Sequence, residues 1–221
     1  RQHPRRAEDT GHRGDRCTER REVEAHLKKQ EGIAMRKILV VVDMQNDFID
    51  GALGTPEAQA IVPKVVKKIE EFDGEVLWTQ DTHSDDYLET QEGRLLPVKH
   101  CISASNGWQI HSSVKAAIQS KHPADDQLNG FEKKTFGSLA LAGRLYPEVA
   151  FGDGIEEIVL VGLCTDICVI SNALLLKAFM PEVKITVDAS CCAGVTPESH
   201  KTALSAMKMC QINIENEGVT A

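Results

Sequence analysis

The sequence predicts a three-layer αβα sandwich, in which a mostly parallel sheet of six strands lies between two layers of helices. From Met35 onward, short apolar runs alternate with amphipathic stretches. The apolar runs are rich in β-branched residues, whereas apolar residues in the stretches between them recur at helical spacing. Alternation of this kind is typical of parallel strands in one sheet with helices on both faces, in a Rossmann-like order.

Three strands and two helices are expected in the first half of this region. Residues 37–43 (KILVVVD) form a continuous β-branched run, which is typical of a strand buried on both faces. Within residues 58–72, the side chains of Ile61, Val65 and Ile69 share one helical stripe. The other expected elements of this half are a strand at 75–80, a helix at 108–120 and a weaker strand at 129–133.

The second half continues the alternation. Residues 157–162 (EIVLVG) are a strong fourth strand. A helix over 197–209 is expected to begin at Pro197, because the fixed φ of proline suits a first helical turn. The remaining elements are helices at 137–145 and 166–179, a fifth strand at 183–188 and a short last strand at 211–215.

Residues 1–34 have a different composition from the rest of the chain. They hold seven of the ten arginines and few aliphatic residues, so they cannot bury a core and are expected to be a disordered extension. Met35 is a candidate translation start, because codons for residues 30–32 (QEG) can contain a ribosome-binding sequence. The alternative is a genuine disordered extension. In both cases, residues 35–221 are expected to form one domain.

Composition favours a cytoplasmic protein that binds neither membranes nor nucleic acid. Hydrophobic residues make up 42% of the chain and charged residues 26%, which is ordinary for a globular protein. No apolar run reaches the roughly 18–20 residues that cross a bilayer. The N-terminus lacks the apolar segment of a signal peptide. The net charge of −8 disfavours an anionic partner, and the seven scattered cysteines suggest reduced thiols.

Unusual polar residues follow the ends of four expected strands. Asp43 ends the first strand, Asp81 and His83 follow the second, Lys133 ends the third, and residues 164–168 follow the fourth. Reactive groups of parallel sheets gather beyond the carboxyl ends of the strands. We therefore expect these residues to lie together on one rim.

Cys168 is the candidate nucleophile on this rim. It lies in the segment 161–169 (VGLCTDICV), where a helix is expected to begin near Thr165 or Asp166, both good N-caps. In the first helical turn, the helix dipole favours a thiolate, and free backbone N–H groups can hold an oxyanion. A cysteine in an apolar helix is more often a core residue, so its role depends on what surrounds it.

The surroundings of Cys168 resemble those of a known superfamily. Residues 162–168 (GLCTDIC) are similar to the G-x-x-T-D-x-C signature of the isochorismatase-like cysteine hydrolases. Residues 43–48 (DMQNDF) look like its D-x-Q-N-D-F block, and residues 133–138 (KKTFGS) are similar to its K-x-x-(F/Y)-(S/G) segment. Because the blocks occur in this order, residues 35–221 are identified as an isochorismatase-like hydrolase domain.

The resemblance implies a catalytic triad of Asp43, Lys133 and Cys168. Asp43 would take the thiol proton, and the Lys133 cation would lower the pKa of the thiol. Lys134 is the rival of Lys133, although two adjacent strand residues point to opposite faces. The superfamily also implies a cis peptide bond before Cys164, with the N–H groups of Cys164 and Cys168 forming the oxyanion hole.

A metal site is the second expected feature. Asp81 and His83 point the same way on an extended segment, and His100 follows later in the chain. Nitrogen and oxygen ligands suit one divalent ion, Zn²⁺ first, with Fe²⁺ or Mn²⁺ as alternatives. Here the resemblance narrows to nicotinamidases, which use such a set to orient the pyridine nitrogen. Glu92 is expected as the fourth ligand. The alternatives for that position are Glu89 and Asp86.

The nicotinamidase resemblance implies hydrolysis of nicotinamide through a thioester, with Phe48 forming one face of the substrate pocket. Two departures bear on the substrate. Residues 100–105 (HCISAS) differ from the usual H-C-x-x-G-T, and Leu96 and Pro97 stand where an aromatic residue often sandwiches the ring. Tyr87 and Trp108 are candidates for a second aromatic face, although packing is the favoured interpretation of both.

Two other functions remain open at this stage. The first is another amidase or ureido hydrolase of the superfamily, and the second is a non-catalytic small-molecule-binding or scaffold protein on the same fold. True isochorismatases are disfavoured, since cleavage of a vinyl ether does not need Cys168. The possible ribosome-binding sequence before Met35 favours a bacterial protein. The resemblance further implies an enzyme of NAD salvage, with a small-molecule amide substrate and a homo-oligomeric assembly.

Overall fold

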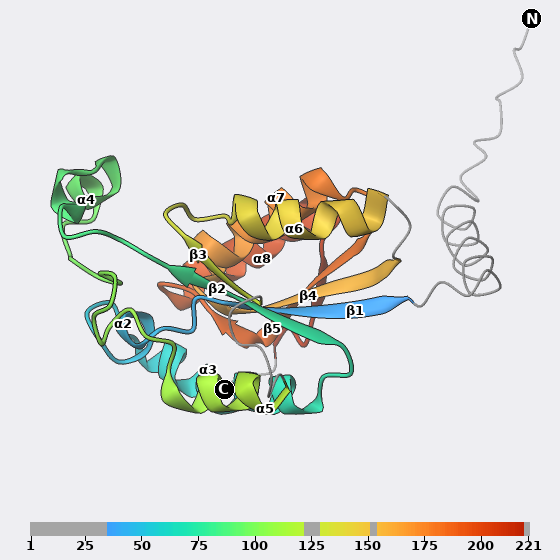
Figure 1. The fold of residues 1–221 in the computed structure, drawn as a ribbon, viewed down its shortest axis with the longest axis horizontal. Coiled ribbons are helices and arrows are strands. Elements are labelled where there is room, and N and C mark those ends of the chain that lie inside the picture. The colour runs from blue at the N-terminus through green and yellow to red at the C-terminus, as the bar shows by residue number, and fades with distance from the viewer. Residues whose placement is uncertain (1–34, 122–128, 151–153, 219–221) are drawn as a thin grey trace, which may run out of the picture. The chain divides into compact units, whose positions relative to one another are not determined.

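A parallel sheet of six strands organises the chain from Arg36 onward (Figure 1). The computed structural model describes residues 35–121, 129–150 and 154–218. Neighbouring strands follow the order β3-β2-β1-β4-β5-β6, and every pairing is parallel. The α/β fold class is therefore confirmed. The expectation that residues 1–34 are disordered lies outside the described residues. The strands are β1 (Arg36–Val42), β2 (Glu75–Asp81), β3 (Gly130–Lys133), β4 (Ile155–Leu163), β5 (Lys184–Ala193) and β6 (Asn213–Glu215).

Helices cover both faces of the sheet. In Figure 1, α3 and α5 lie on one face, and α6, α7 and α8 lie on the other. The described helices are α2 (Asn46–Ile49), α3 (Pro56–Glu71), α4 (Gln91–Leu95), α5 (Ser112–Lys121), α6 (Leu139–Ala150), α7 (Ile170–Phe179) and α8 (Pro197–Met209), with a 3₁₀ turn η1 (Tyr87–Glu89) and a π turn η2 (Thr165–Val169). Among the described residues, no helix combines the length and apolar character that a membrane span requires.

Burial on both faces of the sheet explains why β1 contains an unbroken apolar run. Successive strand residues point to opposite faces. Leu39 and Val41 pack in the cluster that includes α3 and α5, whereas Val40 packs with α6 and α7. All three are fully buried. A strand in the middle of a parallel sheet therefore needs apolar residues at every position.

Gly162 lets the end of β4 approach the end of β1. Its φ is +116°, and a Cβ built there would lie 2.1 Å from the carbonyl oxygen of Val42. Only glycine combines that dihedral angle with so close a backbone contact. Because Gly162 pairs with Val42, the segments that follow them, which carry Asp43 and Cys164, begin side by side.

The expected elements are correct in type and order, but several boundaries are wrong. The helix expected from Trp108 begins at Ser112. The carbonyl of Trp108 accepts hydrogen bonds from the side chains of Gln45 and Gln80, at 2.9 and 2.8 Å, and these long-range contacts hold the segment as a loop. The expected helix 166–179 is the π turn η2 followed by α7. The short helices α2, η1 and α4 were not expected, because three to five residues show no helical period.

Candidate active site

The strand-end residues meet on one rim, as the sequence predicts. Asp43 follows β1, Asp81 ends β2, Lys133 ends β3, and residues 164–168 follow β4. The four strands are consecutive neighbours in the sheet, in the order β3-β2-β1-β4. Asp81 pairs directly with Lys133 in the β2–β3 register. Residues separated by more than a hundred positions in the sequence therefore share one site.

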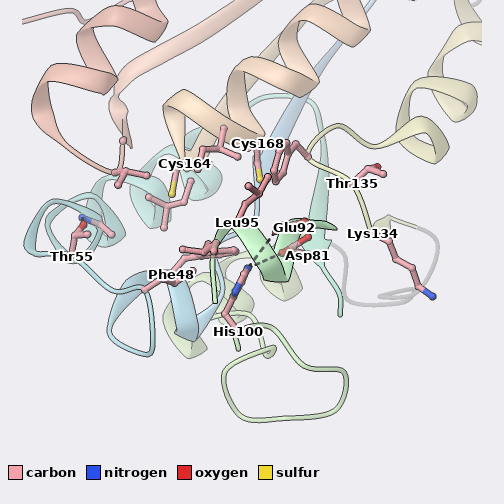
Figure 2. Close-up of a pocket in the computed structure, with 18 of the residues that line it drawn as sticks. Phe48, Thr55, Asp81, Glu92, Leu95, His100, Lys134, Thr135, Cys164 and Cys168 are labelled. Atoms are coloured by element: carbon pink, nitrogen blue, oxygen red, sulfur yellow. Dashed lines mark hydrogen bonds and ion pairs between the residues drawn. The ribbon is translucent and has the colours of Figure 1, made fainter. Parts of the chain in front are cut away.

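Lys133 lies at the centre of the expected triad. Its Nζ is 2.7 Å from Asp43 Oδ2 and 3.5 Å from Cys168 Sγ. The Lys133 side chain is 2% exposed and that of Asp43 is fully buried. Thr79, which sequence reasoning missed, donates a 2.7 Å hydrogen bond to Asp43 Oδ1. Lys134, the rival, is exposed and its side chain points away from the site in Figure 2.

Burial changes the acid–base properties of these groups. It raises the pKa of the Cys168 thiol well above its usual value, and the nearby charge of Asp43 raises it further, while Lys133 opposes the change. Burial likewise raises the pKa of Asp43, against the lowering effect of Lys133. The lowering effect of Lys133 agrees with the expectation from the sequence, although burial outweighs it. A thiol whose pKa is raised needs a base to become a thiolate.

The turn that carries Cys168 is built differently from the expected N-cap. Cys164 is the cap residue of η2, and the peptide bond before it is cis. The side chains of Thr165 and Asp166 do not cap the turn but join it to a neighbouring segment. Thr165 Oγ1 lies 2.8 Å from Nδ1 of His200, and Asp166 accepts a hydrogen bond from the N–H of Val195. These contacts tie the turn to α8 and to the loop before it.

Asp81, His83 and His100 converge to form a candidate metal centre. Asp81 Oδ2 is 2.9 Å from His83 Nε2 and 3.7 Å from His100 Nε2, and the three side chains are buried. Nδ1 of His100 lies 2.8 Å from the carbonyl oxygen of Val98. A proton on Nδ1 would make that contact a hydrogen bond and leave the lone pair of Nε2 facing the cluster.

The donor set fits a divalent ion. Nε2 of His83 is buried without a hydrogen-bond partner of acceptable geometry, although Asp81 Oδ2 is close to it. A ligand nitrogen would show this arrangement, because its lone pair aims at an ion and not at a neighbouring acceptor. Glu92 Oε1 lies 3.7 Å from His83 and 3.9 Å from His100. No such contact with either histidine is found for Glu89 or Asp86 within the described ranges.

Two residues that support the metal centre were not expected from the sequence. Gln45 Nε2 donates to the carbonyl of Asp81 at 2.8 Å, and Gln45 Oε1 accepts from the Asp81 N–H at 2.7 Å. Tyr87 packs its ring 4.6 Å from His83 and 5.0 Å from His100. The packing interpretation of Tyr87 is confirmed, because it is fully buried behind the histidines. The place of Gln45 in the DMQNDF block was the one available signal for its role.

A cavity of about 650 Å³ joins the thiol to the metal centre. Figure 2 shows Cys164 and Cys168 on one side of it and Phe48 and His100 on the other. The Phe48 ring centre lies 5.5 Å from that of His100, so Phe48 forms a wall of the cavity, as expected. Trp108 does not line it and instead donates a 2.8 Å hydrogen bond to Thr82 through its indole N–H. A small molecule in this cavity can contact both Cys168 and the candidate metal ligands Asp81 and His100.

Comparisons with known proteins agree with this geometry. The family model described as Isochorismatase domain matches residues 37–217. The nicotinamidase of Escherichia coli (strain K12) is 26% identical over 194 residues, which cover 78% of this chain and 90% of that protein. The structure of the nicotinamidase/pyrazinamidase PncA from Bacillus subtilis matches with a TM-score of 0.68 at 29% identity, over 81% of this chain and 99% of that chain. The pyrazinamidase of Pyrococcus horikoshii in complex with zinc matches with a TM-score of 0.62 at 26% identity, over 81% and 98% of the two chains.

Proposed function

The chain belongs to the isochorismatase family, and from this premise we propose that it is a nicotinamidase, a cysteine amidohydrolase that converts nicotinamide and water into nicotinate and ammonia. The observation that carries the proposal is the buried contact of Lys133 Nζ with both Asp43 and Cys168, at 2.7 and 3.5 Å. A base, a cation and a thiol in one buried cluster, with the thiol lining the cavity, are the parts that acyl transfer requires.

Acylation begins with proton transfer from Cys168 to Asp43. The thiolate sulfur attacks the carbonyl carbon of the amide, which forms the C–S bond and places negative charge on the carbonyl oxygen. The N–H groups of Cys164 and Cys168 hold this oxyanion. Asp43 returns the proton to the amide nitrogen, the C–N bond breaks, and ammonia leaves a thioester on Cys168.

Deacylation uses the same groups in reverse. Asp43 takes a proton from water, and the resulting hydroxide attacks the thioester carbonyl. The C–S bond breaks, the Cys168 sulfur recovers the proton, and nicotinate leaves. Burial raises the pKa of Asp43, and a carboxylate whose pKa is raised is a stronger proton acceptor than an ordinary one.

The Lys133 cation stabilises the anionic forms of Asp43 and Cys168. Burial lowers its pKa, but the charges of Asp43, Cys168 and Asp81 raise it more, so its net pKa lies above the ordinary value. The side chain therefore remains a cation throughout turnover. Its positive charge offsets the buried charge, whether that charge resides on the carboxylate or on the sulfur.

Asp81, His83, Glu92 and His100 would hold one divalent ion, with zinc as the first candidate. When bound, such an ion supplies an electron-pair acceptor for the pyridine nitrogen and so orients the substrate. Phe48 offers an apolar face to the ring beside this centre. We also propose a cytoplasmic location, which is an expectation from composition, and a place in NAD salvage and a homo-oligomeric assembly, which are expectations from the family resemblance.

The test is release of ammonia from nicotinamide by the purified chain supplied with Zn²⁺. Cys168→Ala should lower kcat by at least about 10³-fold, because the attacking atom is lost. The matched control is Cys210→Ala, since Cys210 is an exposed thiol that does not line the cavity. A Cys168→Ala protein that keeps its rate would exclude this mechanism.

A further inference from the structure

The cavity is larger than a single-ring amide requires. One water occupies roughly 30 Å³, and a bonded ring atom takes less room than a whole water, so the roughly nine non-hydrogen atoms of nicotinamide fill less than about 270 Å³. The cavity of about 650 Å³ would remain more than half empty. Its volume falls in the range that holds drug-sized ligands.

The lining of the cavity divides into a reactive end and an apolar mouth. Cys168, Asp81 and His100 lie at the inner end and are buried. The residues nearer the solvent are large and apolar, and three of them remain strongly exposed: Leu95 at 79%, Val195 at 51% and Phe136 at 47%. These three come from α4, from the loop after β5 and from the loop after β3.

The division into a reactive end and an apolar mouth indicates what kind of molecule the cavity binds. The inner end fits a carboxamide at Cys168 and a ring nitrogen at the Asp81–His100 centre. The mouth offers contacts for hydrocarbon, and apolar surface that leaves water there favours binding. Lys134 also lies at the mouth, but Figure 2 shows its side chain directed away from the cavity. The Lys134 cation therefore does not favour a negatively charged group on the bound molecule.

The segment before His100 has the same character. Leu95 and Leu96 both line the cavity on this side. Two aliphatic side chains provide an apolar surface that can accept varied apolar shapes. We propose that the preferred substrate is a pyridine-3-carboxamide with an additional apolar group on the ring, which lies against Leu95, Phe136 and Val195. This inference rests on the proposed amidase function and specifies its substrate class.

The experiment compares kcat/KM for nicotinamide and for 5-phenylnicotinamide, using the full chain supplied with Zn²⁺ and ammonia release as the readout. The added ring is placed away from both the carboxamide and the ring nitrogen. Each methylene-sized group that leaves water improves binding by about fourfold. A phenyl group that is half buried at the open mouth removes about three such groups from water, so it should raise kcat/KM by at least about tenfold and by up to about sixtyfold, mainly through a lower KM.

Leu95→Trp tests the location of the added group. Leu95 is 79% exposed, so the larger side chain can be accommodated without disturbing the core, and it would fill the mouth. The ratio of kcat/KM for 5-phenylnicotinamide to that for nicotinamide should fall at least fivefold. Met209→Trp is the matched control, because Met209 is 85% exposed and does not line the cavity. Its ratio should equal that of the wild type.

The outcomes separate this inference from the proposed function. If kcat/KM for nicotinamide equals or exceeds kcat/KM for 5-phenylnicotinamide, the inference is overturned and the proposed function stays intact. A ratio that does not respond to Leu95→Trp would overturn the assigned location of the group. Failure to release ammonia from either amide would overturn the proposed function and the inference together.

Discussion

Replacing Lys133 by Met removes one charge from a buried group of ionisable side chains while nearly preserving side-chain length. Lys133 Nζ lies 2.7 Å from Asp43 Oδ2 and 3.3 Å from Asp81 Oδ1. Burial already raises the pKa of Asp43, and Lys133 is the principal group that opposes the increase. In Lys133→Met, the pKa of Asp43 should rise further, so the carboxyl group retains a proton near neutral pH and no longer accepts one from Cys168.

The burial of this pair sets the expected magnitude. The two side chains are 2% and 0% exposed, so solvent screens their interaction weakly. Removing one partner of a buried ion pair costs about 3–5 kcal/mol, and protonation of Asp43 relieves part of that cost, so the free energy of unfolding at pH 7 should fall by about 3 kcal/mol. Loss of the base should reduce kcat by about 10²–10⁴-fold.

The sign of the pH dependence follows from the direction of the Asp43 shift. A carboxyl group whose pKa is raised in the folded state binds its proton more tightly there than in the unfolded chain. Its contribution to stability is complete below the unfolded pKa of about 3.9 and is lost as the pH rises through the folded value. Lys133→Met should therefore lose less stability at pH 4 than at pH 7.

Urea unfolding of metal-free protein at both pH values measures this change, and ammonia release measures the rate. Lys134→Met is the control, because Lys134 is the adjacent exposed lysine. It should remain within about 0.5 kcal/mol of the wild type and retain its rate. If Lys133→Met behaves like Lys134→Met in both assays, the buried ion pair does not have the role assigned to it.

Three further predictions concern the candidate metal centre and the ion pair between Lys68 of α3 and Asp188 of β5. Gln45→Ala removes the hydrogen bonds that the Gln45 side chain makes to the Asp81 N–H and carbonyl, so the free energy of unfolding measured in urea should fall by about 2–4 kcal/mol. Zn²⁺ binding, measured by competition titration, should weaken at least tenfold. An unchanged Zn²⁺ affinity would contradict this prediction. Removal of metal by a chelator should raise the KM for nicotinamide, and added Zn²⁺ should restore it; an unchanged KM would exclude a substrate-orienting metal. Asp188→Asn should cost about 2 kcal/mol, because the nearly buried carboxylate accepts a 2.8 Å hydrogen bond from Lys68. Burial raises the pKa of Asp188, but hydrogen bonds to its carboxylate lower it more, so the net pKa is lowered. The carboxylate therefore stabilises the fold above about pH 4, and this stabilisation is lost as the pH falls through the lowered pKa. If the free energies of unfolding of Asp188→Asn and the wild type differ by the same amount at pH 7 and at pH 3, the prediction is contradicted.

The part of the site that lies on strand ends could be predicted from the sequence. Asp43 directly follows β1 and Lys133 ends β3, and parallel strands bring their carboxyl ends to one rim. This rule depends only on the strand positions and the sheet class, which local patterns specify. The convergence of Asp81 and His83 at the candidate metal centre is predictable for the same reason, because an extended segment fixes the directions of both side chains.

The parts that depend on long-range contacts could not be predicted. The loop at Trp108 is held by glutamine side chains from two distant strand ends, and no local pattern signals those bonds. The position of Glu92 depends on α4, which begins after Thr90 and lacks a helical stripe. The raised pKa of Cys168 depends on complete desolvation in the folded chain, a property that its neighbours in the sequence do not reveal.

The order of strands has a consequence for how activity appears during folding. Every pairing that assembles the rim is parallel and joins distant segments, as in Val42 with Gly162 and Asp81 with Lys133. Such pairings form late, because closing long loops costs entropy before the contacts compensate for it. Partly folded chains with secondary structure but an incomplete sheet would therefore lack the site. Ammonia release during refolding should lag behind the recovery of helical signal and coincide with completion of the central strands.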